Sequence, residues 1–249
     1  MKKALIFLMT ALLAVSLCLP ACAADESDRR LTLVNPRNTI PEGWQVELVS
    51  IGNGHRVDKA CCDDLMAMME ACRAAGLAPE VKSSYRTQAT QERLHENKVR
   101  QWKSYGYSEA EARKKAATIV AVPGTSEHQL GWAVDIVDKS YPVLNEKQAS
   151  MPAQQWLMAH SWEYGFILRY PVDKSAVTGI IYEPWHYRWV GRDNARAIYE
   201  SGLCLEEYLA RQEVHRALRQ AMEGQYPETV RRIFRLLTGN AFPQSVIKP

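Results

Sequence analysis

The chain has no strong excess of either charge. It carries 31 lysines and arginines against 28 aspartates and glutamates. Two of the lysines, Lys2 and Lys3, lie in an N-terminal segment that we expect to be removed. Proteins that bind nucleic acid usually present a clear excess of positive charge. We therefore expect no nucleic-acid partner.

Long apolar runs are also scarce, and the one that stands out covers residues 4–19, directly after the two lysines. Such a short apolar core is typical of a secretory signal peptide and too short to favour a permanent membrane span. Cleavage after Ala23 would give a signal peptide of residues 1–23 and a released protein. Alternatively, Leu19-Pro20-Ala21-Cys22 resembles a bacterial lipobox, in which Cys22 would carry a lipid, although proline is unusual there. Both routes predict an extracytoplasmic protein.

Few cysteines follow this segment: Cys61, Cys62, Cys72 and Cys204. In an oxidising compartment they allow three disulfide pairings, which the sequence does not rank. Cys61 and Cys72 are about three helical turns apart, so they share a face but lie too far apart along the axis to bridge. Two alternatives stay open: Cys204 pairs with a cysteine of this helix, or the four are free buried thiols.

Length and composition fit one globular domain with extensions. Of the 249 residues, 47% are hydrophobic and 24% are charged, which is typical of a folded domain rather than a disordered chain. We predict a polar linker at residues 24–40, the domain at 41–209 and a C-terminal helical extension at 210–249. We expect a monomer.

Periodicity and capping residues predict the elements that precede the first motif. Residues 57–75 carry apolar side chains at helical spacing, which predicts a core helix. A short strand is predicted at residues 79–84. A second helix should follow Thr87 and run to about Trp102, and Ser108 with Glu111 forms a capping box that should open a third.

Two segments far apart in the chain combine histidines with carboxylates. The first is Ser126-Glu127-His128-Gln129-Leu130-Gly131-Trp132-Ala133-Val134-Asp135, and the second is Glu183-Pro184-Trp185-His186. A catalytic zinc site uses three protein ligands, leaves a fourth position for water and has a carboxylate nearby to handle protons. His128, Asp135 and His186 can supply the ligands, and Glu183 the base.

The surroundings of Asp135 favour this interpretation. It stands in the apolar segment 132–137, which predicts a strand, and burying a carboxylate there costs on the order of several kcal/mol unless it is paired or binds a metal. Gly131 lets the chain turn, so that His128 lies on a loop before the strand. One alternative is an Asp135 paired with a basic residue. Another is an iron site with the same ligands, but no jelly-roll pattern of short alternating strands surrounds them.

Three motifs in this order resemble the zinc D-Ala-D-Ala carboxypeptidases of the VanY type. Besides the two segments above, Ser84-Tyr85-Arg86-Thr87 with Gln91 and the approach Val122-Pro123-Gly124-Thr125 match that family. The resemblance covers residues 41–209. It implies an α+β fold in which a small antiparallel sheet carries the zinc site and helices pack around it. It also implies one Zn²⁺ per chain and removal of terminal D-alanine from peptidoglycan stem peptides.

The site chemistry gives each polar residue an expected role. Zinc would polarise the scissile carbonyl and activate water, and Glu183 would take up the proton and return it to the leaving amine. Arg86 would bind either the oxyanion or a substrate carboxylate. The residues expected to bind the peptide are Tyr85, Gln91, Ser126, Trp185 and Tyr187.

The expected partner is a peptidoglycan stem peptide that ends in D-Ala, with membrane anchoring through lipidated Cys22 if the lipobox is used. D,D-carboxypeptidase activity is favoured, while L,D-carboxypeptidase activity on a tetrapeptide and endopeptidase activity on cross-links stay open. Export argues against the free dipeptide, which is a cytoplasmic building block. A zinc-stabilised wall-binding module without catalysis is the alternative of another class, and the presence of Glu183 beside three ligands speaks against it.

Overall fold

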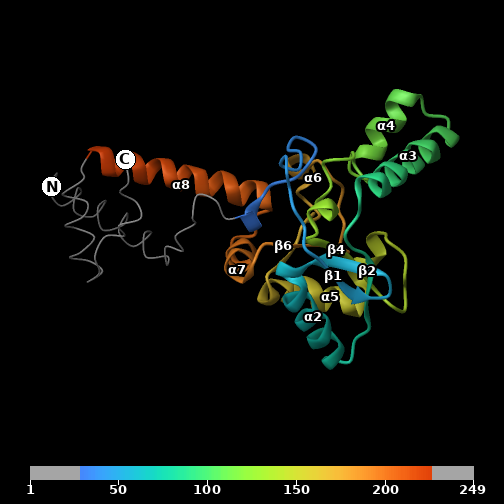
Figure 1. The fold of residues 1–249 in the computed structure, drawn as a ribbon, viewed down its shortest axis with the longest axis horizontal. Helices are drawn as coiled ribbons and strands as arrows, with labels where there is room; N and C mark the ends of the chain where they lie inside the picture. The colour runs from blue at the N-terminus through green and yellow to red at the C-terminus, as the bar shows by residue number, and fades with distance from the viewer. Residues whose placement is uncertain (1–28, 226–249) are drawn as a thin grey trace.

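The computed structural model describes residues 29–225, with side chains up to residue 218. The predicted signal peptide, the lipobox and the last part of the predicted C-terminal extension lie outside these residues. A four-stranded antiparallel sheet, in the order β3-β4-β6-β5, lies beside a separate hairpin of β1 and β2 (Figure 1). The strands are β1 (Leu48–Gly52), β2 (His55–Asp58), β3 (Pro79–Ser83), β4 (Ala133–Asp138), β5 (Phe166–Leu168) and β6 (His186–Trp189).

Helices pack on the sheet and also extend from both sides of the body. α2 and α5 enclose the main core with the strands, α3 and α4 form a projecting hairpin, and α8 extends on the opposite side (Figure 1). The helices are α2 (Lys59–Ala74), α3 (Gln88–Ser104), α4 (Glu109–Ala117), α5 (Pro152–His160), α6 (Ser175–Thr178), α7 (Arg192–Ser201) and α8 (Leu205–Gln225). Short 3-10 helices are η1 (Arg29–Leu31), η2 (Glu127–Leu130), η3 (Glu146–Ser150) and η4 (Ser161–Tyr164). The predicted α+β fold is confirmed.

Side-chain caps mark the starts of three predicted helices, and α2 begins two residues later than predicted. Asp58 accepts a hydrogen bond from the amide of Ala60 at α2, Thr87 accepts one at α3, and Ser108 with Glu111 forms the reciprocal capping box at α4. These side chains satisfy amide groups that have no partner inside a helix. α2, α3 and β3 lie within two residues of their predicted bounds.

The two faces of the sheet carry different side chains. Val134 and Ile136 of β4 lie in the apolar core, together with Tyr187 of β6. Because side chains alternate along a strand, Asp135 and His186 lie on the other face. These two residues are Cα partners in the β4–β6 ladder. Strand pairing therefore brings together residues that are far apart in the sequence.

Two predicted boundaries differ from the structure. The described part of the predicted linker, residues 29–40, packs on the domain: Val34 is fully buried in the core, and Asn35 donates a hydrogen bond to Glu206. α8 begins at Leu205, so it starts inside the predicted domain and continues into the predicted extension. Both differences come from contacts between distant segments, which local composition does not reveal.

The cysteines after the predicted signal peptide are free thiols in the structure. Cys61 and Cys72 are buried on α2, as the helical spacing predicts. Burial raises the pKa of Cys72 and of Cys204 to about 11, so both stay protonated at neutral pH. Across residues 29–225, no helix combines the length and the apolar character needed to cross a membrane.

Candidate metal centre and active site

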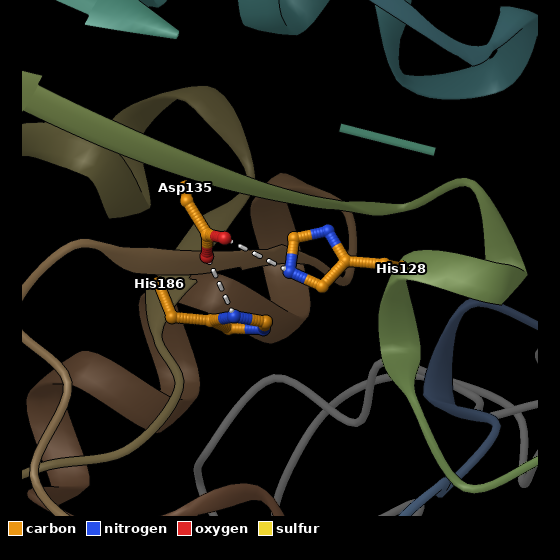
Figure 2. A group of neighbouring side chains, drawn as sticks. All are labelled: His128, Asp135 and His186. Carbon is orange, nitrogen blue, oxygen red and sulfur yellow. Dashed lines mark hydrogen bonds and ion pairs between the residues drawn. The ribbon is translucent and has the colours of Figure 1, made fainter. Parts of the chain in front are cut away.

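The predicted ligands point toward one another (Figure 2), and Asp135 and His186 lie on the sheet face that points away from the core. Asp135 Oδ1 lies 3.0 Å from Nδ1 of its ladder partner His186. His128 comes from η2, and its Nε2 lies 3.2 Å from Asp135 Oδ2. One potential ligand atom of each residue lies within 4.8 Å of the others, and all three residues are buried.

A left-handed glycine makes the turn between His128 and Asp135. Gly131 has a φ of +81°, and a Cβ there would lie 2.6 Å from Val46 Cγ1 and 3.1 Å from Asp58 Cβ. Backbone conformation and space therefore both require glycine. The predicted turn is confirmed, with His128 on a short 3-10 helix.

A hydrogen bond of the His128 ring determines which nitrogen is free. Nδ1 lies 2.9 Å from the carbonyl oxygen of Ser84, which can only accept, so we assign the proton to Nδ1 and the lone pair to Nε2. Burial and the charge of Arg86 lower the pKa of His128 to about 4. The ring is therefore neutral at neutral pH, which is the form that binds a metal.

The other two groups also suit a cation. Burial opposes ionisation of Asp135, but its interactions with His128, His186 and Arg86 outweigh burial and hold the pKa of this carboxyl well below its ordinary value. Burial also disfavours a charged His186, but hydrogen bonds to Asp135 and Glu127 raise its pKa to about 9. Metal binding must therefore displace a proton from His186. Two imidazoles and one carboxylate are a suitable donor set for catalytic zinc.

Glu183 lies beside this cluster, on the turn before β6. Its Oε2 is 3.8 Å from His186 Nδ1. Backbone hydrogen bonds fix the turn: Glu183 N donates to Tyr170 O, and His186 N donates to Glu183 O. Burial raises the pKa of Glu183 to about 8. A carboxyl with this pKa can exchange a proton near neutral pH.

Arg86 connects the cluster to a cavity of about 320 Å³. Its Nη2 donates to Asp135 Oδ2 at 2.8 Å, and its Nε donates to Ser83 Oγ at 2.9 Å. The pairing of Asp135 with a basic residue is therefore present, and the same carboxylate still faces both histidines. The other residues that line the cavity are Thr39, Ile40, Trp44, Val46, Tyr85, Gln88, Gly124 and Gln129.

Only one of the residues predicted to bind the peptide, Tyr85, lines this cavity. Gln91 is fully buried: its Nε2 donates to Ala121 O at 2.7 Å, and its Oε1 lies 3.4 Å from Arg86 Nη1. Gln91 thus supports Arg86 and does not reach the cavity. Ser126, at the start of η2, is also buried.

The two aromatic residues predicted to flank the cleft are buried as well. Trp185 is 7% exposed, and its carbonyl accepts a hydrogen bond from Ile136 N. Tyr187 is fully buried, and its hydroxyl donates to Gln154 Oε1 at 2.8 Å. The predicted position of Tyr187 beside the cleft is wrong because β6 already begins at His186, so the next side chain points into the core.

The structure also contains a buried ionic network that the sequence did not predict. Glu127 Oε1 accepts from Arg169 Nε at 2.8 Å and from Arg188 Nη1 at 2.9 Å. Arg169 makes paired bonds to Glu206 at 2.8 and 2.7 Å. Burial alone would raise the pKa of Glu127, but the two arginines outweigh it and lower that pKa well below its ordinary range. Glu127 is therefore ionised.

One member of this network could have been found by strand alternation. Arg188 follows His186 by two residues in β6, so both lie on the same face. Glu127 stands inside the first motif, but nothing in the sequence marks it as buried. Arg169 and Glu206 lie in different parts of the chain, and only the fold brings them together.

Comparisons with known proteins identify the family of this chain. The family model "VanY: D-alanyl-D-alanine carboxypeptidase" matches residues 54–192, which include the three ligands and Glu183. A D-alanyl-D-alanine carboxypeptidase of Enterococcus faecalis (strain ATCC 700802 / V583) is 47% identical over 186 residues, which cover 74% of this chain and 67% of that protein.

Two solved structures have a similar fold. A mutant of the vancomycin resistance D,D-pentapeptidase VanY from a VanB-type cassette, in complex with Zn(II), is 46% identical with a TM-score of 0.67, covering 72% of this chain and 98% of that one. VanYB in complex with D-Ala-D-Ala is 46% identical with a TM-score of 0.68, covering 73% and 98%. The chain therefore belongs to the VanY family of D-alanyl-D-alanine carboxypeptidases.

Proposed function

We propose that this protein is an exported, zinc-dependent D,D-carboxypeptidase that removes the terminal D-alanine from peptidoglycan stem peptides. One observation carries the proposal: Glu183 lies beside a buried cluster of three metal-ligand side chains, and Arg86 extends from that cluster to a cavity. The relatives support the substrate, since they include a D-alanyl-D-alanine carboxypeptidase and VanYB bound to D-Ala-D-Ala.

Three side chains would hold the zinc. His128 offers Nε2, His186 offers Nδ1, and the carboxylate of Asp135 lies between the two rings. Bound zinc supplies a Lewis acid that polarises the scissile carbonyl and lowers the pKa of water. Arg86 and the strand pairing keep Asp135 in place, so the donor atoms are organised before the metal arrives.

Glu183 would move the proton. Because burial raises its pKa to about 8, this carboxyl can accept a proton from water and return it to the departing amine near neutral pH. A nearby dication favours the ionised carboxylate and would therefore lower this pKa. The metal-loaded enzyme would thus hold Glu183 as a base.

Arg86 would bind the negative charge of the substrate. Each of its three nitrogens has one partner, Ser83, Gln91 or Asp135, and its side chain still lines the cavity. A guanidinium fixed in this way can bind the oxyanion of the tetrahedral intermediate or the terminal carboxylate of the peptide. The peptide would enter along Tyr85 and Trp44, which line the same cavity.

Export rests on the N-terminal sequence. The apolar run and the small residues after it favour a signal peptide, ending either at Ala23 or before a lipidated Cys22. A substrate in the cell wall requires such export, and the wall-peptidase relatives are consistent with it. We therefore place the protein at the outer surface of the bacterial membrane or beyond it.

Mass spectrometry of product peptides tests the function. The zinc-loaded protein without its signal segment is incubated with a muramyl pentapeptide ending in D-Ala-D-Ala, the matching tetrapeptide, and a pentapeptide ending in D-Ala-L-Ala. We expect loss of one alanine from the first peptide alone. Glu183→Gln should slow this loss by about 10²- to 10⁴-fold, because it removes the proton acceptor.

Other outcomes identify the alternatives. Cleavage of the tetrapeptide alone would indicate an L,D-carboxypeptidase. If all three peptides stayed intact but cross-linked wall material were cut, the enzyme would be an endopeptidase. Intact substrates throughout, with one bound zinc, would favour a wall-binding module.

A further inference from the structure

Glu127 is a fully buried carboxylate that the mechanism above does not use. It precedes His128 on η2, and its Oε2 lies 3.4 Å from His186 Nε2. This is the ring nitrogen that faces away from Asp135, since His186 Nδ1 lies 3.0 Å from Asp135 Oδ1. The His186 ring is therefore held between two carboxylates, one at each nitrogen.

The other oxygen of Glu127 is fixed by two arginines. Arg169 Nε donates to Oε1 at 2.8 Å, and Arg188 Nη1 donates to the same oxygen at 2.9 Å. Both arginine side chains are fully buried, so water does not compete for these bonds. The carboxylate is thus clamped through Oε1 and has Oε2 available for His186.

We propose that Glu127 is a positioning residue that holds the His186 ring so that Nδ1 points at the metal. A histidine that binds a metal through one nitrogen usually donates its other N–H to a carboxylate or carbonyl, which fixes the ring orientation and strengthens the ligand. His128 has such a partner in the Ser84 carbonyl, and Glu127 supplies the equivalent for His186. This inference rests on the proposed ligand set.

The ion pairs around Glu127 continue through Arg169 to the start of α8. Arg169 makes paired hydrogen bonds to Glu206 in the first turn of that helix, and Asn35 donates to Glu206 from the N-terminal segment. Glu206 bonds to Arg169 and Asn35 rather than to Glu127 or His186, yet it belongs to the same network. It therefore offers a control that perturbs the network without touching the histidine.

A purely structural role would give a different result. If Glu127 only neutralised Arg169 and Arg188, its loss would lower stability and leave the zinc affinity of the folded protein unchanged. If it positions His186, its loss lowers zinc affinity even where the protein is fully folded.

The experiment compares Glu127→Gln, Glu127→Asp and Glu206→Gln in the full mature protein. Zinc dissociation constants are measured by competition with a chromophoric chelator, at a temperature where each metal-free variant is folded by circular dichroism. Glu127→Gln leaves one accepting oxygen for three donors. Glu127→Asp keeps a negative charge beside the two arginines, so this variant should fold. Its side chain is one methylene shorter, so it should not reach His186.

We expect both Glu127 variants to raise the zinc dissociation constant by about 10- to 100-fold and to change the visible spectrum of the cobalt-loaded protein. Glu206→Gln should lower the melting temperature and leave the dissociation constant within about 3-fold. Unchanged affinity in both Glu127 variants, or equal losses in all three, would overturn the inference. His186→Ala tests the ligand set separately: if it binds zinc like the wild type, the proposed site itself is wrong.

Discussion

Gln91→Leu tests whether the buried amide of Gln91 acts through Arg86. The substitution keeps the side chain similar in volume but removes the hydrogen bond to Ala121 O and the contact with Arg86 Nη1. Leaving this part-buried acceptor without its donor costs on the order of 1–3 kcal/mol. For a chain of this size, 1 kcal/mol corresponds to about 2–4 °C in Tm, so we expect Tm to fall by about 2–12 °C.

The matched control is Gln101→Leu, on the exposed side of the same helix. It should change the free energy of unfolding by less than about 0.5 kcal/mol, because surface substitutions away from special features have small effects. Thermal unfolding followed by circular dichroism gives both values. A fall as large for Gln101→Leu as for Gln91→Leu would contradict the assigned cause.

Steady-state kinetics of D-alanine release then separate support of Arg86 from direct substrate binding. A misplacement of about 1 Å near the reacting atoms can cost up to about 100-fold in rate, so we expect Gln91→Leu to lose about 10- to 100-fold. Arg86→Lys should also lower the rate of D-alanine release. The double variant of Gln91→Leu and Arg86→Lys should release D-alanine only slightly more slowly than Arg86→Lys alone. Fully additive losses, with the Gln91→Leu effect confined to KM, would refute the reasoning.

Three further predictions follow from single contacts. Gly131→Ala should cost about 1–3 kcal/mol from the left-handed backbone alone, and more from the methyl group that would meet Val46, and it should weaken zinc binding because it moves His128; Tm and a chelator competition measure the two effects. In the metal-free protein, Glu183→Gln should be increasingly stabilising as pH rises from about 4.5 to about 8. The folded protein holds the Glu183 proton more tightly than the unfolded chain does, so the wild type loses stability over that range, and glutamine does not titrate; a constant difference in Tm between pH 5 and pH 8.5 would contradict this. Tyr187→Phe should cost about 1–3 kcal/mol because it leaves the buried Gln154 Oε1 without its donor, and it should leave kcat/KM unchanged, whereas a large rise in KM would indicate that Tyr187 contacts the substrate.

The sequence predicted the ligand cluster because two of the ligands, Asp135 and His128, had an independent local reason. Asp135 was out of place in an apolar strand, and Gly131 marked the turn that brings His128 back to it. Helix caps such as Thr87 and Ser108 were equally predictable, since they depend on neighbouring residues alone. Local chemistry therefore determined these features.

Features that depend on distant contacts were not predictable in this way. Tyr187 was misplaced because the first residue of β6 decides which face each side chain occupies, and that register comes from pairing with β4. Val34 packs in the core and Glu206 pairs with Arg169, and both contacts join segments that are far apart in the sequence. Gln91 matched a family motif, but only the fold revealed that its side chain is fully buried against Arg86.

The most direct test is a zinc titration of D-alanine release. Metal-free protein is mixed with a pentapeptide ending in D-Ala-D-Ala, zinc is added in steps, and free D-alanine is measured at each step for the wild type and for His128→Ala. We predict no release without metal, a linear rise that ends sharply at one zinc per chain in the wild type, and no release by the variant. Full activity in the presence of a chelator, or equal activity of His128→Ala, would contradict a single zinc site at His128, Asp135 and His186.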